Sequence, residues 1–203
     1  ACDKAAGSRR AYDRCSARDV TVINHRGGSG AGKSWAVKTI IERATRYDRR
    51  PDPYNPDRDL AQLIEVDGLP IACLGDYRLE RGVFYGAESM CSAYGIPYAL
   101  DAIAQLVVEG YHVLAKGKLL SFGRQWLSLS RGLLEPNGHH LVIARLDTTL
   151  DECVINIYAR RERTGRNVRG SLNQVELLQN WKRRPTWLAA RGVDTREIPW
   201  RTS

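Results

Sequence analysis

The feature that most constrains this chain is a glycine-rich stretch, RGGSGAGKSW, at residues 26–35. It follows the apolar run VTVIN and precedes a segment whose apolar residues recur at helical spacing. Its four glycines let the backbone adopt conformations that other residues avoid and let it approach a ligand closely. Between a buried strand and a helix, such a stretch predicts a loop that surrounds an anion with its N–H groups.

The same stretch satisfies the pattern G-x-x-x-x-G-K-[ST], which predicts binding of a nucleoside triphosphate, most simply ATP with Mg²⁺. Lys33 is expected to reach the β- and γ-phosphates, and Ser34 is expected to ligate Mg²⁺ through its hydroxyl. The helix that follows would add the positive end of its dipole. The predicted phosphate-binding residues are Gly27, Gly28, Ser29, Gly30, Ala31, Gly32, Lys33 and Ser34.

Beyond this loop, apolar strands alternate with helices, which predicts an α/β fold. Strands are expected at 19–27, 69–77, 111–117, 139–147 and in VDTREIPW, and helices at 32–48, 97–110, about 123–134, 148–163 and 172–184. The order indicates a three-layer P-loop NTPase fold: a parallel five-stranded sheet with helices on both faces. The proline-rich stretch at 49–59 and the region from Gly82 to Gly95 are expected to be irregular. Residues 1–18 are interpreted as an N-terminal arm, and residues 19–203 as one domain.

Charge and composition limit the kinds of molecule that this chain is expected to bind. The net charge is +8, and the stretch from Arg160 to Arg191 holds nine Lys or Arg against two Glu. This stretch predicts a polyanionic partner such as nucleotide phosphates or DNA, although a solvated basic face would have the same composition. The five cysteines contain no CxxC pair, which argues against zinc or a disulfide framework. With no apolar run near the roughly 20 residues that span a membrane, a cytoplasmic location is expected by default.

A second stretch, LVIARLDTTLDECVINIYARRERTGR, combines a strand, an aspartate, a capped helix and an arginine-rich loop. Together with INHRGGSGAGKS, LGDY and GYHVLAKGKLLS, in this order, it resembles the phage-encoded kinases of the thymidylate kinase-like superfamily, from about residue 20 to 200. The chain also has no NKxD stretch of the kind that reads guanine. The resemblance implies an ATP- and Mg²⁺-dependent phosphotransferase, located in the host cytoplasm if phage-encoded.

The resemblance leaves the acceptor open. Its best candidate is a hydroxyl of 5-hydroxymethyluracil in phage DNA. The alternatives are a thymidylate-like nucleoside or nucleotide kinase, a small-molecule kinase, or a nucleotide-binding protein that has lost transfer. The oligomeric state is left open as well. The resemblance also implies an arginine-rich lid at about 160–171, in which Arg160, Arg161, Arg163 and Arg166 are candidates, with Arg160 and Arg166 assigned to catalysis.

Two residues depart from the resemblance. Lys116 stands where the family pattern has a glutamate after its third strand, and an ammonium group there opposes a metal ion but could hold a phosphate. Asp76 stands where the pattern has a histidine, at the carboxyl end of a strand, where the sites of open α/β sheets gather. Asp76 could be the base that orients the acceptor hydroxyl and a metal ligand, or a surface aspartate.

Some residues keep two interpretations. Asp147 ends the fourth strand and could belong to the metal site or cap the next helix. Thr149 and Glu152 have the spacing of a capping box. Trp181 could pack in the core or stack on a base. The remaining candidates, which would contact the acceptor, are Arg78, Arg81, Tyr85 and Tyr94.

Overall fold

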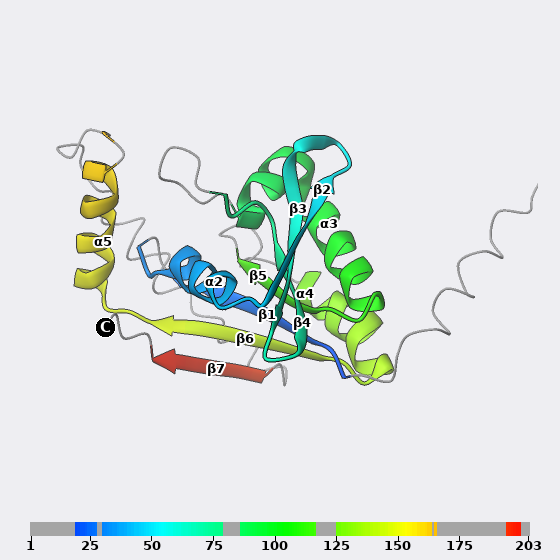
Figure 1. The fold of residues 1–203 in the computed structure, drawn as a ribbon. Helices are drawn as coiled ribbons and strands as arrows, with labels where there is room; N and C mark the ends of the chain where they lie inside the picture. Colours follow the sequence, from blue (N-terminus) through cyan, green and yellow to red (C-terminus); the bar gives the residue numbers. More distant parts are fainter. Residues whose placement is uncertain are drawn as a thin grey trace, which may run out of the picture.

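The computed structural model describes residues 19–27, 30–78, 86–116, 125–163, 165 and 194–199. In these residues the chain forms one seven-stranded sheet with the strand order β2-β3-β4-β5-β1-β6-β7 (Figure 1). The predicted α/β class is therefore confirmed. The strands are β1 (Thr21–Arg26), β2 (Arg46–Asp52), β3 (Asn55–Val66), β4 (Leu69–Leu74), β5 (His112–Lys116), β6 (His140–Asp147) and β7 (Asp194–Pro199).

Five of these strands form the parallel part of the sheet. β4 pairs with β5, β5 with β1, β1 with β6, and β6 with β7, each in parallel. They coincide with the five strands expected from the sequence. Val22 on β1 lies in register with Val113 and Leu141 on its two neighbours, and all three side chains are buried. Apolar strands buried on both faces are typical of parallel sheets.

The expectation of a purely parallel sheet was wrong, because a hairpin extends it by two antiparallel strands. The helix expected at 32–48 ends at Glu42, and the stretch expected to be an irregular loop forms β2, a turn and the start of β3. The turn is closed by the N–H of Tyr54, which donates to the Asp52 carboxylate at 2.9 Å. Pro51 is tolerated because β2 pairs only with β3, so the missing N–H falls on an edge strand, where the register also shifts.

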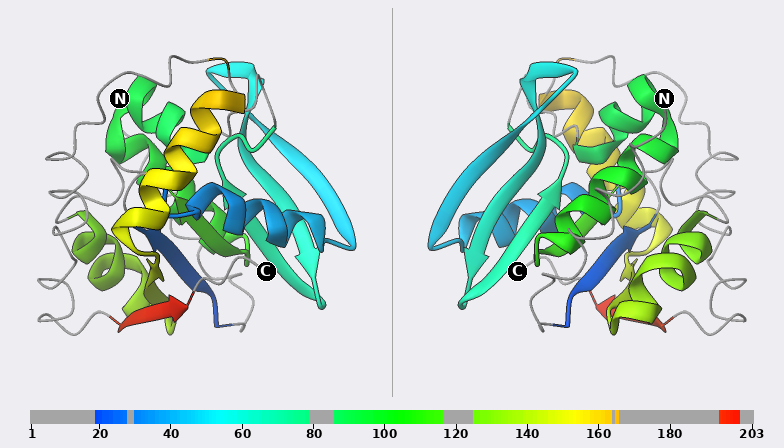
Figure 2. Two further views of the ribbon diagram at one scale, coloured as in Figure 1. Left: turned by 90° about the vertical axis from the view of Figure 1, so that its left-hand side faces the viewer. Right: turned by 90° about the vertical axis from the view of Figure 1, so that its right-hand side faces the viewer.

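Helices cover both faces of the sheet (Figure 2). Helix α2 (Lys33–Glu42) packs on one face, and α3 (Gly86–Val108) and α4 (Gln125–Leu129) pack on the other. A π-helical turn, η1 (Ser130–Leu134), and a 3₁₀ turn, η2 (Glu135–Asn137), follow α4. Helix α5 (Leu150–Arg163) continues beyond the end of β6. The arm at 1–18 and the helix expected at 172–184 lie outside the described residues.

Helix α3 begins eleven residues before the start expected from the sequence, so the region expected to be irregular is helical from Gly86 on. The sequence conceals this because α3 is interrupted at Gly95, which has φ 87° and ψ 168°, just before Pro97. Among the described helices, α3 alone is long and apolar enough to span a membrane by length and composition. Its buried residues, among them Ile103 and Leu106, belong to the same core cluster as the sheet, as in the core helix of a globular domain.

Candidate functional site

The strand order directs attention to the carboxyl end of β1. From β1 the chain first builds the sheet on one side, through β4 and β5, and only later adds β6 and β7 on the other side. In open α/β sheets, ligands bind where the strand order reverses in this way, outside the carboxyl ends of the strands. The glycine loop, residues 27–32, begins at this point and leads directly into α2.

The glycine loop is held from one side by α5 and the segment before it. Gly30 has φ 84°, and a Cβ atom added to it would lie 2.2 Å from the carbonyl oxygen of Cys153. The Asn156 amide donates to the Gly30 carbonyl at 2.9 Å, and the Thr148 hydroxyl donates to the Ala31 carbonyl at 3.1 Å. Gly30 and Ala31 are therefore held by these contacts, and only glycine fits at position 30. Gly28 and Ser29 lie outside the described residues.

Lys33 is the first residue of α2, and its ammonium group donates to the carbonyl of Gly27 at 2.8 Å. Burial and the nearby Lys116 ammonium lower the pKa of Lys33 to about 8. The first turn of α2 contains no acidic residue, so nothing in that turn offsets the positive end of the helix dipole. Ser34, the expected metal ligand, is the next residue and is partly buried.

Lys116, at the end of β5, is 6% exposed, and it lies in register with His25 on β1. Burial lowers its pKa; Glu88 acts to raise that pKa, and Arg160 acts to lower it further. None of the ion pairs found among the described residues includes Lys116. The lysine that departs from the family pattern is thus buried beside Lys33, at the same edge of the sheet.

Arg160, in the last turn of α5, acts on the two lysines at the carboxyl ends of the strands. Its charge lowers the pKa of both Lys33 and Lys116, which places it within electrostatic range of the two ammonium groups. Arg161 and Arg163 lie in the same helical turn. Three of the cations that the sequence singled out are therefore within electrostatic range of one another. Arg166, most of the expected lid and the rest of the basic stretch, with Trp181, lie outside the described residues.

Asp76 is buried directly after β4 and is bound by Arg78. The backbone N–H of Arg78 donates to its carboxylate at 2.9 Å, and the guanidinium Nη2 lies 2.5 Å from Oδ2. Burial raises the pKa of Asp76, but the hydrogen bonds from Arg78 outweigh burial and hold it below its ordinary value. Arg78 also lies 3.8 Å from the buried carboxylate of Asp59, which pairs with Arg49 at 2.6 Å. In this geometry the carboxylate of Asp76 fixes Arg78.

The strand β6 ends at Asp147, and the predicted capping box follows it. The N–H of Thr149 donates to the Glu152 carboxylate at 2.8 Å, and the N–H of Glu152 donates to the Thr149 hydroxyl at 3.3 Å. This is the reciprocal pattern of a capping box and confirms that prediction. The other expected acceptor contacts are divided: Arg78 and Tyr94 are described, and Arg81 and Tyr85 lie outside the described residues.

Sequence reasoning missed a row of buried polar residues at the end of β1. Asn24, His25 and Arg26 are 1%, 5% and 6% exposed. Arg26 donates to the Asn24 side chain at 3.0 Å, but its Nη2 atom, the Asn24 amide nitrogen and His25 Nδ1 have no partner among the described residues. Burial lowers the pKa of Arg26 to about 10. Three consecutive polar residues at the end of an otherwise apolar strand were the signal that could have revealed them.

His25 predicts that the protein loses stability in mild acid. Burial, aided by Lys33, lowers the pKa of His25 from 6.5 to about 4. Between these pH values the unfolded chain binds the proton and the folded chain does not. Stability present above pH 6.5 is therefore lost as the pH falls to 4, by about 3 kcal/mol. Urea unfolding at pH 7 and pH 4.5 measures the loss. His25→Gln, which does not titrate, is expected to lose clearly less, and equal losses in both proteins would contradict the assignment.

Comparison with known proteins gives one relative. The chain is 31% identical, over 148 residues, to a protein named 5-hmdU DNA kinase from Pseudomonas phage PaMx11. The match covers 69% of this chain and 69% of the relative. No family model matches the chain.

Proposed function

The chain belongs to the same family as the phage 5-hmdU DNA kinase, and on that premise we propose that it is an ATP- and Mg²⁺-dependent kinase that phosphorylates 5-hydroxymethyluracil in phage DNA. The observation that carries this proposal is the glycine loop that leads from β1 into α2, with the Lys33 ammonium group bound to it and with Lys116 and Arg160 within electrostatic range. In the proposal, the domain at 19–203 is a P-loop NTPase fold, the arginines at the end of α5 begin its lid, and it acts in the host cytoplasm.

The described residues fit a triphosphate. The glycine loop offers bare backbone at Gly30 and Gly32, both with φ 84°, and the loop is followed by the start of a helix, whose free N–H groups favour anions. Buried cations with lowered pKa values are stabilised when an anion binds beside them. The residues that would hold the phosphates are those of the glycine loop, with Lys33, Lys116 and Arg160.

The metal would depend on few protein ligands. The part of the chain that the structure describes contains no group of three or more His, Cys, Asp or Glu that could hold an ion. Mg²⁺ in proteins is commonly held by one or two protein oxygens together with substrate phosphates and water. Ser34 would supply such an oxygen, and a bound Mg²⁺ would neutralise charge on the phosphates. Asp76 could join it only if Arg78 moved away.

The reaction asks the protein mainly to position groups and to stabilise charge. The acceptor hydroxyl oxygen bonds to the γ-phosphorus while the bond from phosphorus to the bridging oxygen breaks, and ADP leaves with the electron pair. Lys33, Lys116 and Arg160 would stabilise the negative charge on the transferred group. Arg78, held by Asp76 after β4, would contact the acceptor.

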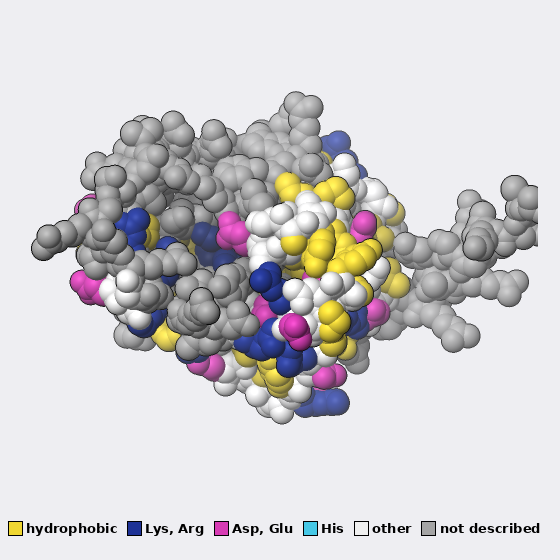
Figure 3. Space-filling view, turned by 90° about the horizontal axis from the view of Figure 1, so that it is seen from above, with side chains coloured by type: hydrophobic (Ala, Val, Ile, Leu, Met, Phe, Trp, Pro, Cys, Tyr) yellow, Lys and Arg dark blue, Asp and Glu magenta, His cyan; other side chains and the backbone are white. Residues whose placement is uncertain are grey.

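An acceptor base in duplex DNA would have to leave the stack to reach a site at the edge of the sheet, because enzymes that modify bases extrude them. On the described part of the upper face, basic and acidic side chains are interspersed and form no single basic patch (Figure 3). We therefore assign binding of the DNA backbone to the basic stretch at 160–191, whose excess of Lys and Arg suits a polyanion.

A γ-phosphate transfer assay with radiolabelled ATP and Mg²⁺ tests the proposal. The acceptors are duplex DNA with and without 5-hydroxymethyluracil, thymidine monophosphate and other nucleotides, and Lys33→Ala is the control. Label on the modified DNA alone is the expected result. Label on a mononucleotide would identify a nucleotide kinase instead. Bound ATP with no labelled acceptor would favour a protein that has lost transfer, for which Lys116 is the structural reason.

A further inference from the structure

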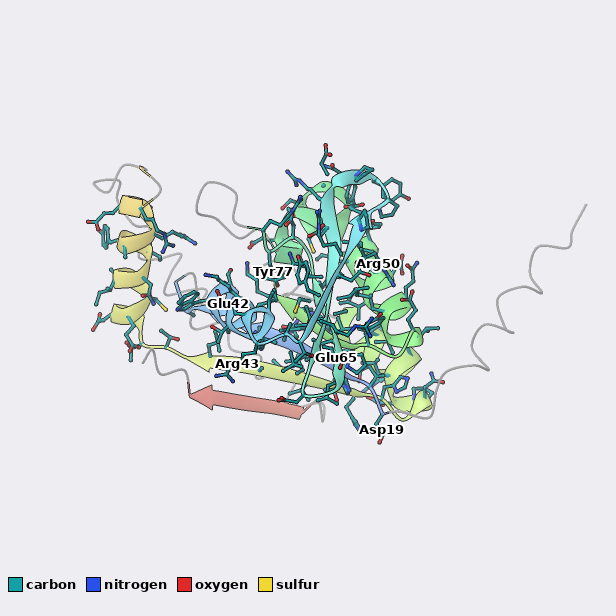
Figure 4. All side chains as sticks on the ribbon, in the orientation of Figure 1. Asp19, Glu42, Arg43, Arg50, Glu65 and Tyr77 are labelled. Carbon is teal, nitrogen blue, oxygen red and sulfur yellow. The ribbon has the colours of Figure 1, made fainter. Side chains whose placement is uncertain are left out.

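The inference concerns Lys116 and Glu88, a carboxylate in the first turn of α3. The side chain of Lys116 lies against the first residue of α3: a Cβ atom added to Gly86 would lie 3.2 Å from its Cδ and 3.3 Å from its Nζ. The same point lies 3.2 Å from the hydroxyl oxygen of Tyr77. Tyr77 is 5% exposed, lies between α2 and the hairpin, and its hydroxyl has no partner among the described residues (Figure 4).

The start of α3 is fixed at this place by its backbone. The N–H of Gly86 donates to the carbonyl of Asp76 at 2.7 Å. A Cβ atom added to Gly75, where φ is 101°, would lie 2.1 Å from the carbonyl carbon of Gly86. The end of β4 and the start of α3 therefore cross in direct contact. Glu88, in the first turn of α3, is in consequence held near the carboxyl ends of the strands.

The two lysines lie among several charges. Lys33, Lys116 and Arg160 act on one another, and Glu88 is a carboxylate that raises the pKa of both lysines. Ammonium groups that repel each other away from bulk water raise the free energy of the site unless an anion lies between them. The arrangement thus suits a negatively charged group that approaches the lysines from the side of Glu88.

We propose that Lys116 contacts the γ-phosphoryl group during its transfer, and that Glu88, from the first turn of α3, orients the acceptor hydroxyl and receives its proton. This assignment rests on the proposed kinase function. As the acceptor oxygen bonds to the γ-phosphorus, its proton passes to the Glu88 carboxylate and then to water, while ADP takes the electron pair of the broken bond. Tyr77, whose hydroxyl lies near the same point, is a positioning residue for the acceptor.

The two roles predict different defects. Glu88→Gln removes the proton acceptor but keeps the shape, so single-turnover transfer is expected to fall by about 10²- to 10⁴-fold. Its affinity for ATP, measured by displacement of a fluorescent analogue, is expected to stay within threefold, and Glu88→Asp is expected to recover part of the rate. Lys116→Met is expected to weaken ATP binding by roughly 10-fold or more and ADP binding less, because ADP lacks the γ-phosphate.

The exposed pair Lys38 and Glu42, on the far side of α2 from its start, provides matched controls. Lys38→Met and Glu42→Gln make the same chemical changes and are expected to behave as wild type. Circular dichroism shows whether each variant is folded. Transfer by Glu88→Gln within threefold of wild type would overturn the role of Glu88, and unchanged ATP affinity in Lys116→Met would overturn the role of Lys116.

The failures are distinguishable. If wild type labels an acceptor and Glu88→Gln labels it equally fast, the kinase function stands and the inference falls. If wild type labels no acceptor, the proposed function fails and the role of Glu88 fails with it. The ATP and ADP affinities of Lys116→Met decide the role of Lys116 in either case.

Discussion

Replacing Lys33 with alanine is expected to lower the rate of phosphoryl transfer by about 10³-fold. Lys33 is the first residue of α2, and its ammonium group donates to the Gly27 carbonyl of the glycine loop. Because the pKa of this group is about 8, it carries most of its charge at pH 7. Single-turnover transfer from radiolabelled ATP measures the loss. ATP affinity is expected to fall as well, because the positive charge nearest the loop is gone.

The same substitution should leave the fold intact. Lys33→Ala removes one of two ammonium groups that repel each other, so the temperature of unfolding is expected to stay equal or to rise. Lys38→Ala, five residues further along α2, is the matched control and should transfer at the wild-type rate. A Lys33→Ala protein that transfers phosphate within tenfold of wild type would contradict the assignment of the glycine loop.

The second large effect is expected from Gly30→Ala. The added methyl group would lie 2.2 Å from the carbonyl oxygen of Cys153, so the glycine loop and α5 would have to separate. We expect ATP affinity to fall by at least 10-fold, because the loop N–H groups would lose their alignment. Equilibrium binding of a fluorescent ATP analogue and thermal unfolding measure the two consequences.

Gly68→Ala separates the clash from backbone strain. Gly68, in the turn between β3 and β4, has φ 76°, close to the value of Gly30, but an added Cβ atom meets nothing within 4 Å. It should cost only the strain of a left-handed alanine, about 1 kcal/mol, and leave ATP binding unchanged. If the two variants bound ATP equally well, contact between the glycine loop and α5 would have no part in forming the site.

The parallel part of the fold was predictable because its strands can be recognised from their own residues, without knowledge of their partners. An apolar run of five to nine residues bounded by glycine, aspartate or proline has few alternatives to a buried strand, and the four such runs form β1, β4, β5 and β6. The fifth parallel strand, β7, comes from the more polar stretch VDTREIPW. The hairpin was not predictable in the same way. β2 has the sequence RYDRRPD, with exposed charges and a proline, and it forms a strand only because β3 offers it a partner.

The site was predictable where one motif contains its parts, and not where the fold assembles them. The pattern ending in Lys33 and Ser34 lies in consecutive residues, so the sequence alone indicated the loop. Glu88 and Tyr77 became candidates only when the crossing of β4 and α3 brought the Tyr77 hydroxyl near Lys116 and the first turn of α3, which contains Glu88, to the same end of the sheet. For Asp76 the sequence could not show that Arg78, two residues later, binds its carboxylate.

The hairpin also gives the sheet a protected border. β2 is an edge strand, and the outer backbone groups of an edge strand can form hydrogen bonds with a strand from another molecule. Its exposed charges, the missing N–H of Pro51 and the register shift beside it make that border a poor template. The buried apolar strands further inside the sheet are thereby shielded on that side from pairing with a strand of another molecule.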